Sequence, residues 1–436
     1  MRSRLTFAGP ISRPFAAAAG CVLVAACSDA TGPPSPAGGD SGVLSGTLTA
    51  NRTLSADTVY LIQGTTIIED GVTLTIPAGT TLKGDVNYAG SAMIVRQGGR
   101  IVARGTADAP IVFTSSAAEG SRSRGDWGGV VLNGRSHCNF PAQECVGEGG
   151  SGPYGGSELN DDSGVLSYVR IEYAGYEVSF GNELNGLTLN GVGAGTELHH
   201  IQSHYGSDDG IEFFGGTVDL KYAVVTGASD DSFDFSTGWQ GRGQFWVVIQ
   251  DPFDADNGFE VDGNEENFDA IPLTNPTIYN VTLIGKPAGV GSAGESPRGI
   301  IFRRGTAGSI HNVVVLGFEK GIDLDQIETV ESDGVTLTNS YFFGQTSGTF
   351  EEDEDGIDEE AYLGNVVWSN AFDTDPMLTD PYSTLAPDLR PISTSPLVSG
   401  GATPAADGFF DQVSFIGGVD PNGEQWFDAW ITRDIN

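Results

Sequence analysis

Two acidic motifs in the middle of the chain could do chemistry. Residues 204–216 read HYGSDDGIEFFGG, and residues 226–238 read TGASDDSFDFSTG. In each motif, two adjacent aspartates are followed three residues later by another acid between apolar residues. Carboxylates held close together either bind a cation or raise one another's pKa and act as acid and base. Calcium is the natural cation, because it takes about six to eight oxygen ligands in flexible geometry.

The two motifs belong to a longer series of repeats. Successive copies begin 24, 22, 26, 41 and 22 residues apart, at Asn185, Asp209, Asp231, Asn257, Arg298 and Lys320. A period near 22 residues, with two or three short strands per repeat, is typical of one turn of a right-handed parallel β-helix. We therefore predict an all-β fold, a single β-helix domain over residues 44–436. Caps are expected at about residues 44–65 and 376–436, since open sheet edges need covering.

Side chains alternate between the two faces of a strand, so the repeats predict two buried ladders and one outward column. The first ladder comprises Ile211, Phe233, Phe259, Ile300 and Ile322, and the second Phe213, Phe235, Val261, Phe302 and Leu324. The outward column comprises Glu212, Asp234, Glu260 and Asp323, interrupted by Ile301.

The outward acids are candidates for ligand binding. Strands of adjacent coils lie about 4.8 Å apart, so Glu212, Asp234 and Glu260 would bring their carboxylates together and could bind Ca²⁺. With Asp323 they would form a ligand-binding surface. Asp208, Asp230 and Asp256, one position before the repeated Asp or Asn, could add ligands at the same edge, but we predict that they form the turns.

The same face could instead be catalytic, with Asp231, Asp234, Glu260 and Arg298 as candidates. Two carboxylates about 5 Å apart suit a retaining glycosidase. A lyase would need a base and a positive charge, which Arg298 could supply. The simpler alternative for Arg298 is an ion pair with a neighbouring acid.

Aromatic residues near the acidic column suggest a sugar-binding surface. Trp239 and Trp246 lie close to the column in sequence, and exposed flat rings stack on sugar faces. We predict that both contribute to ligand binding, whereas Trp127, Trp426 and Trp430 are expected in packing or caps.

The N-terminus has the features of a lipoprotein signal peptide over residues 1–26. Arg2 and Arg4 precede a short apolar stretch, and LVAAC at residues 23–27 resembles a bacterial lipobox. This predicts lipidation of Cys27, a flexible linker over residues 27–43, and anchoring by lipid at the outer membrane and cell surface.

Two cysteines remain in the expected mature domain, Cys138 and Cys145. In an exported protein a pair this close is most simply a disulfide. The alternative is a metal site, which would need two more ligands where only His137 is nearby.

The charge of the chain restricts its partners. Asp and Glu number 58 against 21 Lys and Arg, giving a net charge of −37. Such a chain repels nucleic acid and attracts cations or basic partners. No motif for an organic cofactor is present.

Several segments carry a resemblance to a known family. GVTLTIPAGTTLKG, GDWGGVVLNG, SDDGIEFFGGTVDLKYAVVTGASDDSFDF and the terminal QWFDAWI resemble a large family of bacterial right-handed parallel β-helix (pectin-lyase-like) cell-surface lipoproteins, mostly of unassigned function. The wider fold includes polysaccharide lyases and hydrolases. We expect a surface-anchored, non-catalytic protein that binds polysaccharide or another extracellular ligand. The alternatives are a polysaccharide lyase or glycoside hydrolase, and a structural or adhesion module.

Overall fold

The computed structural model describes residues 42–331, 334–351, 356–383 and 386–436. The described residues belong to one compact unit that begins at Gly42. The expected signal peptide, Cys27 and the linker up to residue 41 lie outside the described residues. Among the described residues, none of the helices is long and apolar enough to span a membrane.

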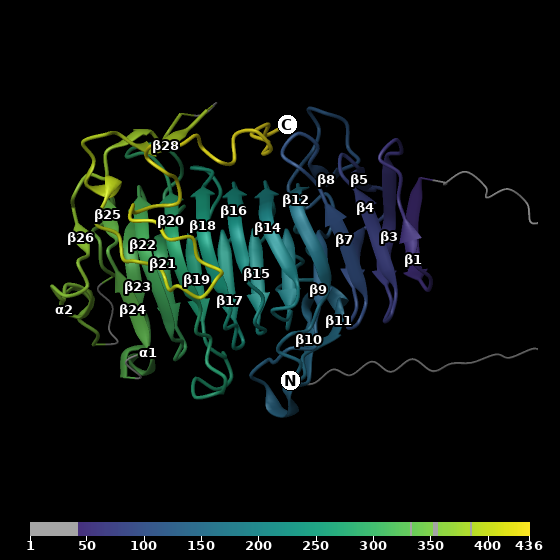
Figure 1. Ribbon diagram of the computed structural model, residues 1–436, viewed down its shortest axis with the longest axis horizontal. Coiled ribbons are helices and arrows are strands. Elements are labelled where there is room, and N and C mark those ends of the chain that lie inside the picture. Colours follow the sequence, from purple (N-terminus) through teal and green to yellow (C-terminus); the bar gives the residue numbers. More distant parts are fainter. Residues whose placement is uncertain (1–41, 332–333, 352–355, 384–385) are drawn as a thin grey trace, which may run out of the picture. The chain divides into compact units, whose positions relative to one another are not determined.

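The compact unit is a parallel β-helix (Figure 1) in which the strand pairs follow three parallel series, and long strands connect these series into a single 24-stranded sheet. We refer to each series as a sheet. One of them, here called the cleft sheet, carries the acidic repeats, and neighbouring strands in it pair in parallel. Its strands are β1 (Val43–Leu48), β3 (Tyr60–Ile68), β6 (Ala92–Val95), β9 (Val130–Asn133), β13 (Leu187–Asn190), β15 (Ile211–Phe214), β17 (Phe233–Ser236), β19 (Phe259–Asp262), β21 (Arg298–Arg303) and β23 (Lys320–Leu324).

Long bent strands join the other two sheets. These are β12 (Gly164–Glu172), β14 (Glu197–His204), β16 (Leu220–Thr226), β18 (Arg242–Ile249), β20 (Thr277–Ile284) and β22 (Gly308–Leu316). Short strands complete the two sheets: β2 (Arg52–Thr53), β4 (Thr73–Pro77), β5 (Thr81–Gly84), β7 (Arg100–Arg104), β8 (Ile111–Ser115), β24 (Val335–Thr338), β25 (Tyr341–Phe343) and β26 (Ala371–Phe372).

Each bend in these strands is made by one residue with a left-handed backbone. Tyr168, His200 and Tyr222 occupy this position in three successive coils, with φ of 49°, 56° and 61°. This conformation is uncommon for residues other than glycine. Stacking between coils offsets part of its cost, because the ring centroids of His200 lie 4.2 Å from those of Tyr168 and 4.4 Å from those of Tyr222.

The interior confirms the predicted ladders. Every residue of both ladders is fully buried, with an exposed fraction of 0%. One coil cannot bury these side chains alone, whereas stacked coils form a continuous apolar core. The outward direction of the intervening residues follows directly from this burial.

The C-terminal segment, residues 396–436, runs along the side of the β-helix (Figure 1). Amide side chains on the bent strands bind its backbone: Asn312 to Ala402, Gln244 to Asp411 and Gln202 to Thr432. The prediction that residues 376–436 close the end of the helix is therefore wrong. At that end, Phe350, Leu363 and Phe372 pack against the core instead. The other predicted cap, residues 44–65, contains β1 and β2 of the first coil and the start of β3, which pairs with β1 and belongs to the next coil.

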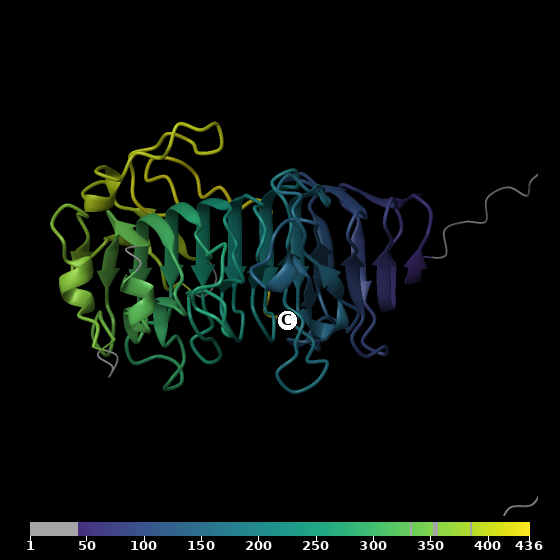
Figure 2. The same ribbon diagram turned by 90° about the horizontal axis from the view of Figure 1, so that it is seen from below.

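The remaining elements lie in loops and in the C-terminal region. They are β10 (Cys145–Gly147), β11 (Gly152–Tyr154), β27 (Leu378–Asp380), β28 (Asp388–Pro391), α1 (Ile327–Glu331), α2 (Glu359–Leu363) and single 3₁₀ turns at Pro141–Gln143, Glu148–Gly150 and Pro396–Val398. Figure 2 shows the long loops leaving the coils on the side away from the C-terminal segment. β10 and β11 form a hairpin, and the predicted disulfide between Cys138 and Cys145 is confirmed at its base.

Candidate functional site

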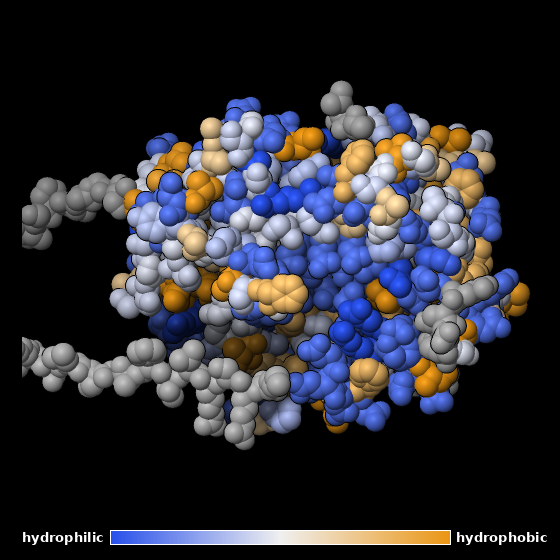
Figure 3. Space-filling model, turned by 180° about the vertical axis from the view of Figure 1, so that it is seen from behind, coloured by the Kyte–Doolittle hydropathy of each residue, from blue (hydrophilic) through white to orange (hydrophobic). Residues whose placement is uncertain are grey.

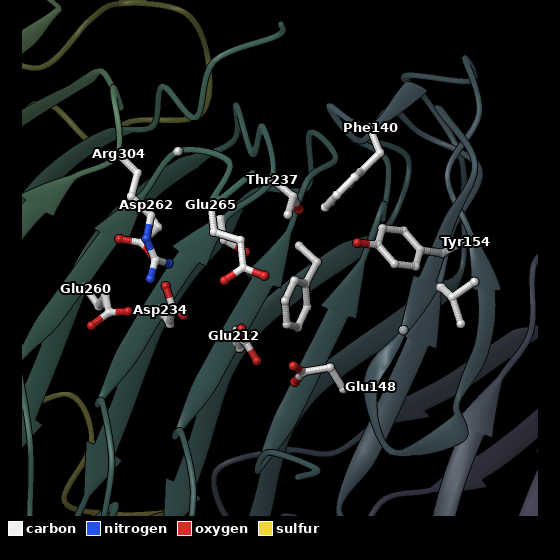
Figure 4. Close-up of a pocket in the computed structure, with 15 residues that line it drawn as sticks. Phe140, Glu148, Tyr154, Glu212, Asp234, Thr237, Glu260, Asp262, Glu265 and Arg304 are labelled. Carbon is white, nitrogen blue, oxygen red and sulfur yellow. The ribbon is translucent and has the colours of Figure 1, made fainter. Parts of the chain in front are cut away.

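The cleft sheet brings three of the predicted acids onto adjacent strands. Glu212 of β15 lies opposite Asp234 of β17, which lies opposite Glu260 of β19. Figure 4 shows the three carboxylates in a row. Asp323 belongs to the same column but is separated from Glu260 by Ile301. The structure therefore groups three of the four predicted column acids and leaves Asp323 outside.

A cavity of ≈ 310 Å³, here called the aromatic-walled cavity, lies between this row and the β10–β11 hairpin (Figure 4). Its acidic side is lined by Glu148, Glu212, Asp234, Glu260, Asp262 and Glu265. Its apolar wall is formed by Phe140, Val146, Tyr154 and Phe214. The volume lies in the range of small-ligand pockets, about 300–1,000 Å³. The cavity thus offers an apolar face on one side and carboxylates on the other.

A second pocket of ≈ 370 Å³ adjoins the first and is lined almost entirely by acids. It contains Asp208, Asp230 and Asp256, and it shares Glu148, Glu212, Asp234 and Glu260 with the aromatic-walled cavity. We call this second space the acidic pocket, and the two together the acidic cleft. Hydrophilic side chains also cover a broad area of one face of the molecule (Figure 3).

The two adjacent aspartates of each repeat have different roles. The Asp209 carboxylate accepts a hydrogen bond from the Asp231 backbone N–H at 3.0 Å, and the Asp231 carboxylate accepts one from the Asn257 N–H at 2.7 Å. The second aspartate therefore holds the turn of the next coil. One oxygen of Asp231, a predicted catalytic candidate, is committed to this task. Asp208 and Asp230, which we predicted as turn formers, line the acidic pocket.

Burial is the main cause of raised pKa values throughout the cleft. It raises the pKa of Glu148 to about 7, with repulsion from Glu183 and Glu265 adding to the effect. Burial, followed by repulsion from Asp230, raises the pKa of Asp208 to about 8. The pKa of Glu260 is raised to about 7 by burial and by Asp262. Burial also raises the pKa values of Asp209, Glu212, Asp231 and Asp234 well above their usual range.

The basic residues that line the described cleft are already paired. Arg303 places its Nε 2.5 Å from Asp262 and also pairs with Glu260, and Arg304 pairs with Asp262. Arg298, which we predicted as a catalytic candidate that could supply positive charge, lies outside both cavities. Its Nε is 2.6 Å from an oxygen of Asp323. Its geometry is that of the ion pair we gave as the simpler alternative.

One group of oxygens has the spacing of a cation site. Asp209, Glu212 and Asp234 each offer a carboxylate oxygen, and these atoms lie within 4.8 Å of one another. This donor set is made only of oxygen, as calcium prefers. It contains two of the three predicted metal ligands. Glu260, the third, contacts Arg303 instead.

Three buried oxygens at the aromatic-walled cavity have no hydrogen-bond partner. They are Oδ1 of Asp234, Oγ of Ser236 and Oγ1 of Thr237, and all three residues line the cavity. Ser236 is 9% exposed. Our sequence reasoning missed Ser236, although strand alternation places it on the same face as Asp234, two residues earlier.

Trp239 and Trp246 are not exposed, so our prediction that they bind a ligand is wrong. Both side chains are fully buried. The indole N–H of Trp239 donates to the Val218 carbonyl at 3.1 Å, and that of Trp246 donates to the Leu220 carbonyl at 3.0 Å. Both rings belong to the core, stacked on Phe213 and Phe233. Trp127 and Trp430 are buried, as expected for packing.

Other residues of the cleft come from loops that the repeat pattern does not cover. Glu148 follows β10, Glu183 lies in the loop before β13, and Glu265 follows β19. The first two loops are tied together by the Gly149 N–H, which donates to the Asn182 side chain at 2.8 Å. The only signal for these residues in the sequence is an acid within a glycine-rich or acidic loop.

The fold and the site define a parallel β-helix with a carboxylate-lined cleft on its outer face. A family model described as a pectate-lyase-like β-helix domain matches residues 46–369, and the chain belongs to this family. Among solved structures, the crystal structure of pectate lyase Pel9A matches with 13% identity and a TM-score of 0.40, covering 81% of this chain and 89% of that one. No curated protein matches the chain.

Proposed function

We propose that this chain is a lipid-anchored protein of the bacterial cell surface whose acidic cleft binds an extracellular polysaccharide without cleaving it. The anchor would be Cys27 in the outer membrane, as the lipobox-like residues 23–27 suggest. Membership of the pectate-lyase-like family supports a carbohydrate ligand. A row of side chains along successive coils also suits a polymer, because equivalent positions repeat along the helix axis.

We further propose that Ca²⁺ binds in the cleft, at Asp209, Glu212 and Asp234. The close approach of their oxygens carries this proposal. Burial and mutual repulsion make their ionised forms costly, and a divalent cation would offset that cost. Glu260 stays next to the cluster as a further candidate ligand. Bound calcium would also reduce the repulsion between the cleft and any anionic groups of the polysaccharide.

Binding is favoured over lyase chemistry that depends on arginine, because Arg298, Arg303 and Arg304 are all held in ion pairs. A lyase needs a positive group to neutralise a uronate and a base to remove a proton. Arg303 and Arg304 are held by Glu260 and Asp262, and Arg298 is held by Asp323.

Hydrolysis of glycosidic bonds is the second candidate, favoured by one observation. Glu148 and Glu260 have pKa values of about 7, so either can be protonated at neutral pH, as a general acid must be.

Calorimetric titration of Ca²⁺ into residues 42–436, which form a compact unit, tests the proposed cation site. We expect Glu212→Gln and Asp234→Asn each to weaken calcium binding at least about tenfold, a loss of ~1.4 kcal/mol. Asp57→Asn, at an exposed acid between β2 and β3, is the matched control. Unchanged calcium affinity in both cleft variants would refute the site.

The same protein is then incubated with neutral, acidic and amino polysaccharides. Binding should occur without release of unsaturated products or new reducing ends. Product release that Asp234→Asn abolishes would replace the binding proposal with an enzymatic one.

A further inference from the structure

The aromatic-walled cavity contains buried polar atoms without hydrogen-bond partners, and these atoms indicate which kind of ligand fits it. Oδ1 of Asp234 is buried without a hydrogen-bond partner, and Oγ of Ser236, in a residue only 9% exposed, is in the same condition. A buried acceptor that finds no donor costs about 1–3 kcal/mol, and more when it carries charge. Because both residues line one cavity, a single bound group could satisfy both. That group must donate hydrogen bonds to a carboxylate.

The opposite wall of the cavity is apolar and would pack against an apolar surface of the ligand. Tyr154 and Phe214 have ring centroids 6.5 Å apart and line the cavity together with Phe140 and Val146. Aromatic side chains of this kind stack on the C–H faces of sugar rings, and they also attract cations. An occupant with an apolar ring face and donor groups at its edge fits both walls.

The charge around the cavity selects between sugars. Six carboxyl groups line it, and its one lining arginine, Arg304, is paired with Asp262. A uronic acid would add a further anion, and Arg304 is not free to pair with it, so only the proposed calcium ion could offset its charge. A neutral sugar could donate hydroxyl hydrogens but would leave the repulsion among the carboxylates unrelieved. A protonated amine brings three N–H donors together with a positive charge.

We infer that the aromatic-walled cavity binds an amino-sugar residue of a polysaccharide, with its ammonium group at Asp234 and Ser236 and its ring against Tyr154 and Phe214. This inference rests on the proposed function and names the class of sugar for the same cleft. Calcium in the neighbouring cluster is compatible with it, because the carboxylate of Asp234 has a second oxygen besides Oδ1. The binding step is non-covalent and needs no co-reactant.

Titration of the chain with matched oligosaccharides tests the inference. The probes are a glucosamine oligosaccharide with free amines, its N-acetylated counterpart of equal length, a neutral glucose oligosaccharide and an oligogalacturonide, each with and without Ca²⁺. The free-amine probe should bind at least about tenfold more tightly than its N-acetylated counterpart, because acetylation removes the charge and two of the donors. Added salt should weaken that binding more than it weakens binding of the neutral probe.

Ser236→Ala provides the sharper variant, because it removes one acceptor without changing the charge. We expect it to weaken binding of the free-amine probe by about tenfold. Its calcium affinity should be unchanged, since Ser236 does not belong to the cation cluster. Ser393→Ala, an exposed serine in the C-terminal region, is the matched control and should bind like the unmodified chain.

The possible failures are distinguishable. If the neutral, N-acetylated or uronate probe binds as tightly as the free-amine probe, the amino-sugar inference is overturned and the proposed polysaccharide binding stands. If none of the probes binds, both are overturned. If Ser236→Ala binds the free-amine probe with unchanged affinity, the placement of the amine is overturned.

Discussion

Asp209, Glu212 and Asp262 show that position decides what an acid does in this fold. One carboxylate oxygen of Asp209 accepts a hydrogen bond from a backbone N–H of the next coil. Glu212, three residues further on, points outward and lines both cavities. Asp262, at the end of its strand, is held between Arg303 and Arg304. Ligand binding therefore depends mainly on outward acids such as Glu212, joined by Asp209 in the proposed cation site, while backbone and arginine contacts hold the strands and turns in place.

At the residue scale, the two core tryptophans give a direct test of which side chains belong to the site. Trp246→Phe removes a hydrogen bond to the Leu220 carbonyl and leaves space beside Phe233. We expect the free energy of unfolding to fall by about 1–3 kcal/mol, measured by denaturant titration. Affinity for calcium and for oligosaccharide should not change.

The control for this variant is Phe180→Ala, since Phe180 is 98% exposed and its loss should leave stability unchanged. If the Trp246→Phe protein had normal stability and reduced oligosaccharide affinity, this tryptophan would belong to the binding site after all.

The column Glu212, Asp234 and Glu260 could be predicted because strand alternation and the repeat spacing determine it. Trp246 could not be placed in the same way. The left-handed residue Phe245 precedes it at the bend of β18, so simple alternation does not hold across the bend. Glu148 and Glu265 come from loops whose paths depend on contacts between distant residues, and no local pattern predicts those.

At the scale of elements, the repeated parts of the fold could be predicted from the sequence, whereas the parts without repeats could not. The cleft sheet follows from repeats in which each copy supports its neighbours. The C-terminal segment has no repeat, and its path along the side depends on single amide side chains. Gln202 both donates to the Thr432 carbonyl at 2.7 Å and accepts from its N–H at 2.8 Å. Gln244 makes the same pair of contacts with Asp411. An amide side chain thus takes the place of a neighbouring β-strand.

These amide contacts predict how the C-terminal segment can be released. Replacing Gln202 and Gln244 together by leucine removes the partners of two part-buried peptide groups of the segment, at a cost of about 0.5–1.5 kcal/mol for each hydrogen bond lost. We expect limited proteolysis to cut within residues 396–436 at least about tenfold faster, while the rest of the chain remains protected. The measurement is mass spectrometry of timed digests.

Gln63→Leu is the control for this pair, because Gln63 of β3 contacts Asp85 and not the C-terminal segment. Equal cleavage rates in the double variant and the control would mean that apolar packing, through Phe427 and Trp430, suffices to hold the segment.

At the scale of the whole molecule, negative charge is concentrated in a buried site, where the ionised form of a carboxyl group is costly. The chain has a net charge of −37, and the acidic cleft gathers carboxyl groups in a buried site. Burial raises their pKa values, so folding without a cation drives these groups to hold protons. A ligand cation would replace those protons. Cation binding, proton release and stability are therefore coupled in this protein.

This coupling predicts an unusual dependence of stability on pH. Asp208, Glu148 and Glu260 have folded pKa values of about 8, 7 and 7, above their ordinary values, so the folded chain holds more protons than the unfolded chain at neutral pH. Stability must then fall as pH rises toward about 8. The five histidines, whose pKa values are all lowered, act in the opposite direction only below about pH 6.5. Above about pH 6.5, the change in stability with pH therefore reflects the carboxyl groups.

Thermal melts of residues 42–436 between about pH 6.5 and about pH 8 measure the effect. In chelator, the midpoint should fall by at least ~2 °C as pH rises. Calcium should raise the midpoint, and by more at the higher pH, where fewer protons compete for the carboxylates. The double variant Glu212→Gln with Asp234→Asn removes two buried charges, so its midpoint should depend less on both pH and calcium. A midpoint in chelator that stays level or rises over this interval would show that the cleft carboxyls do not hold protons in the folded chain, and the argument for a resident cation would lose its electrostatic basis.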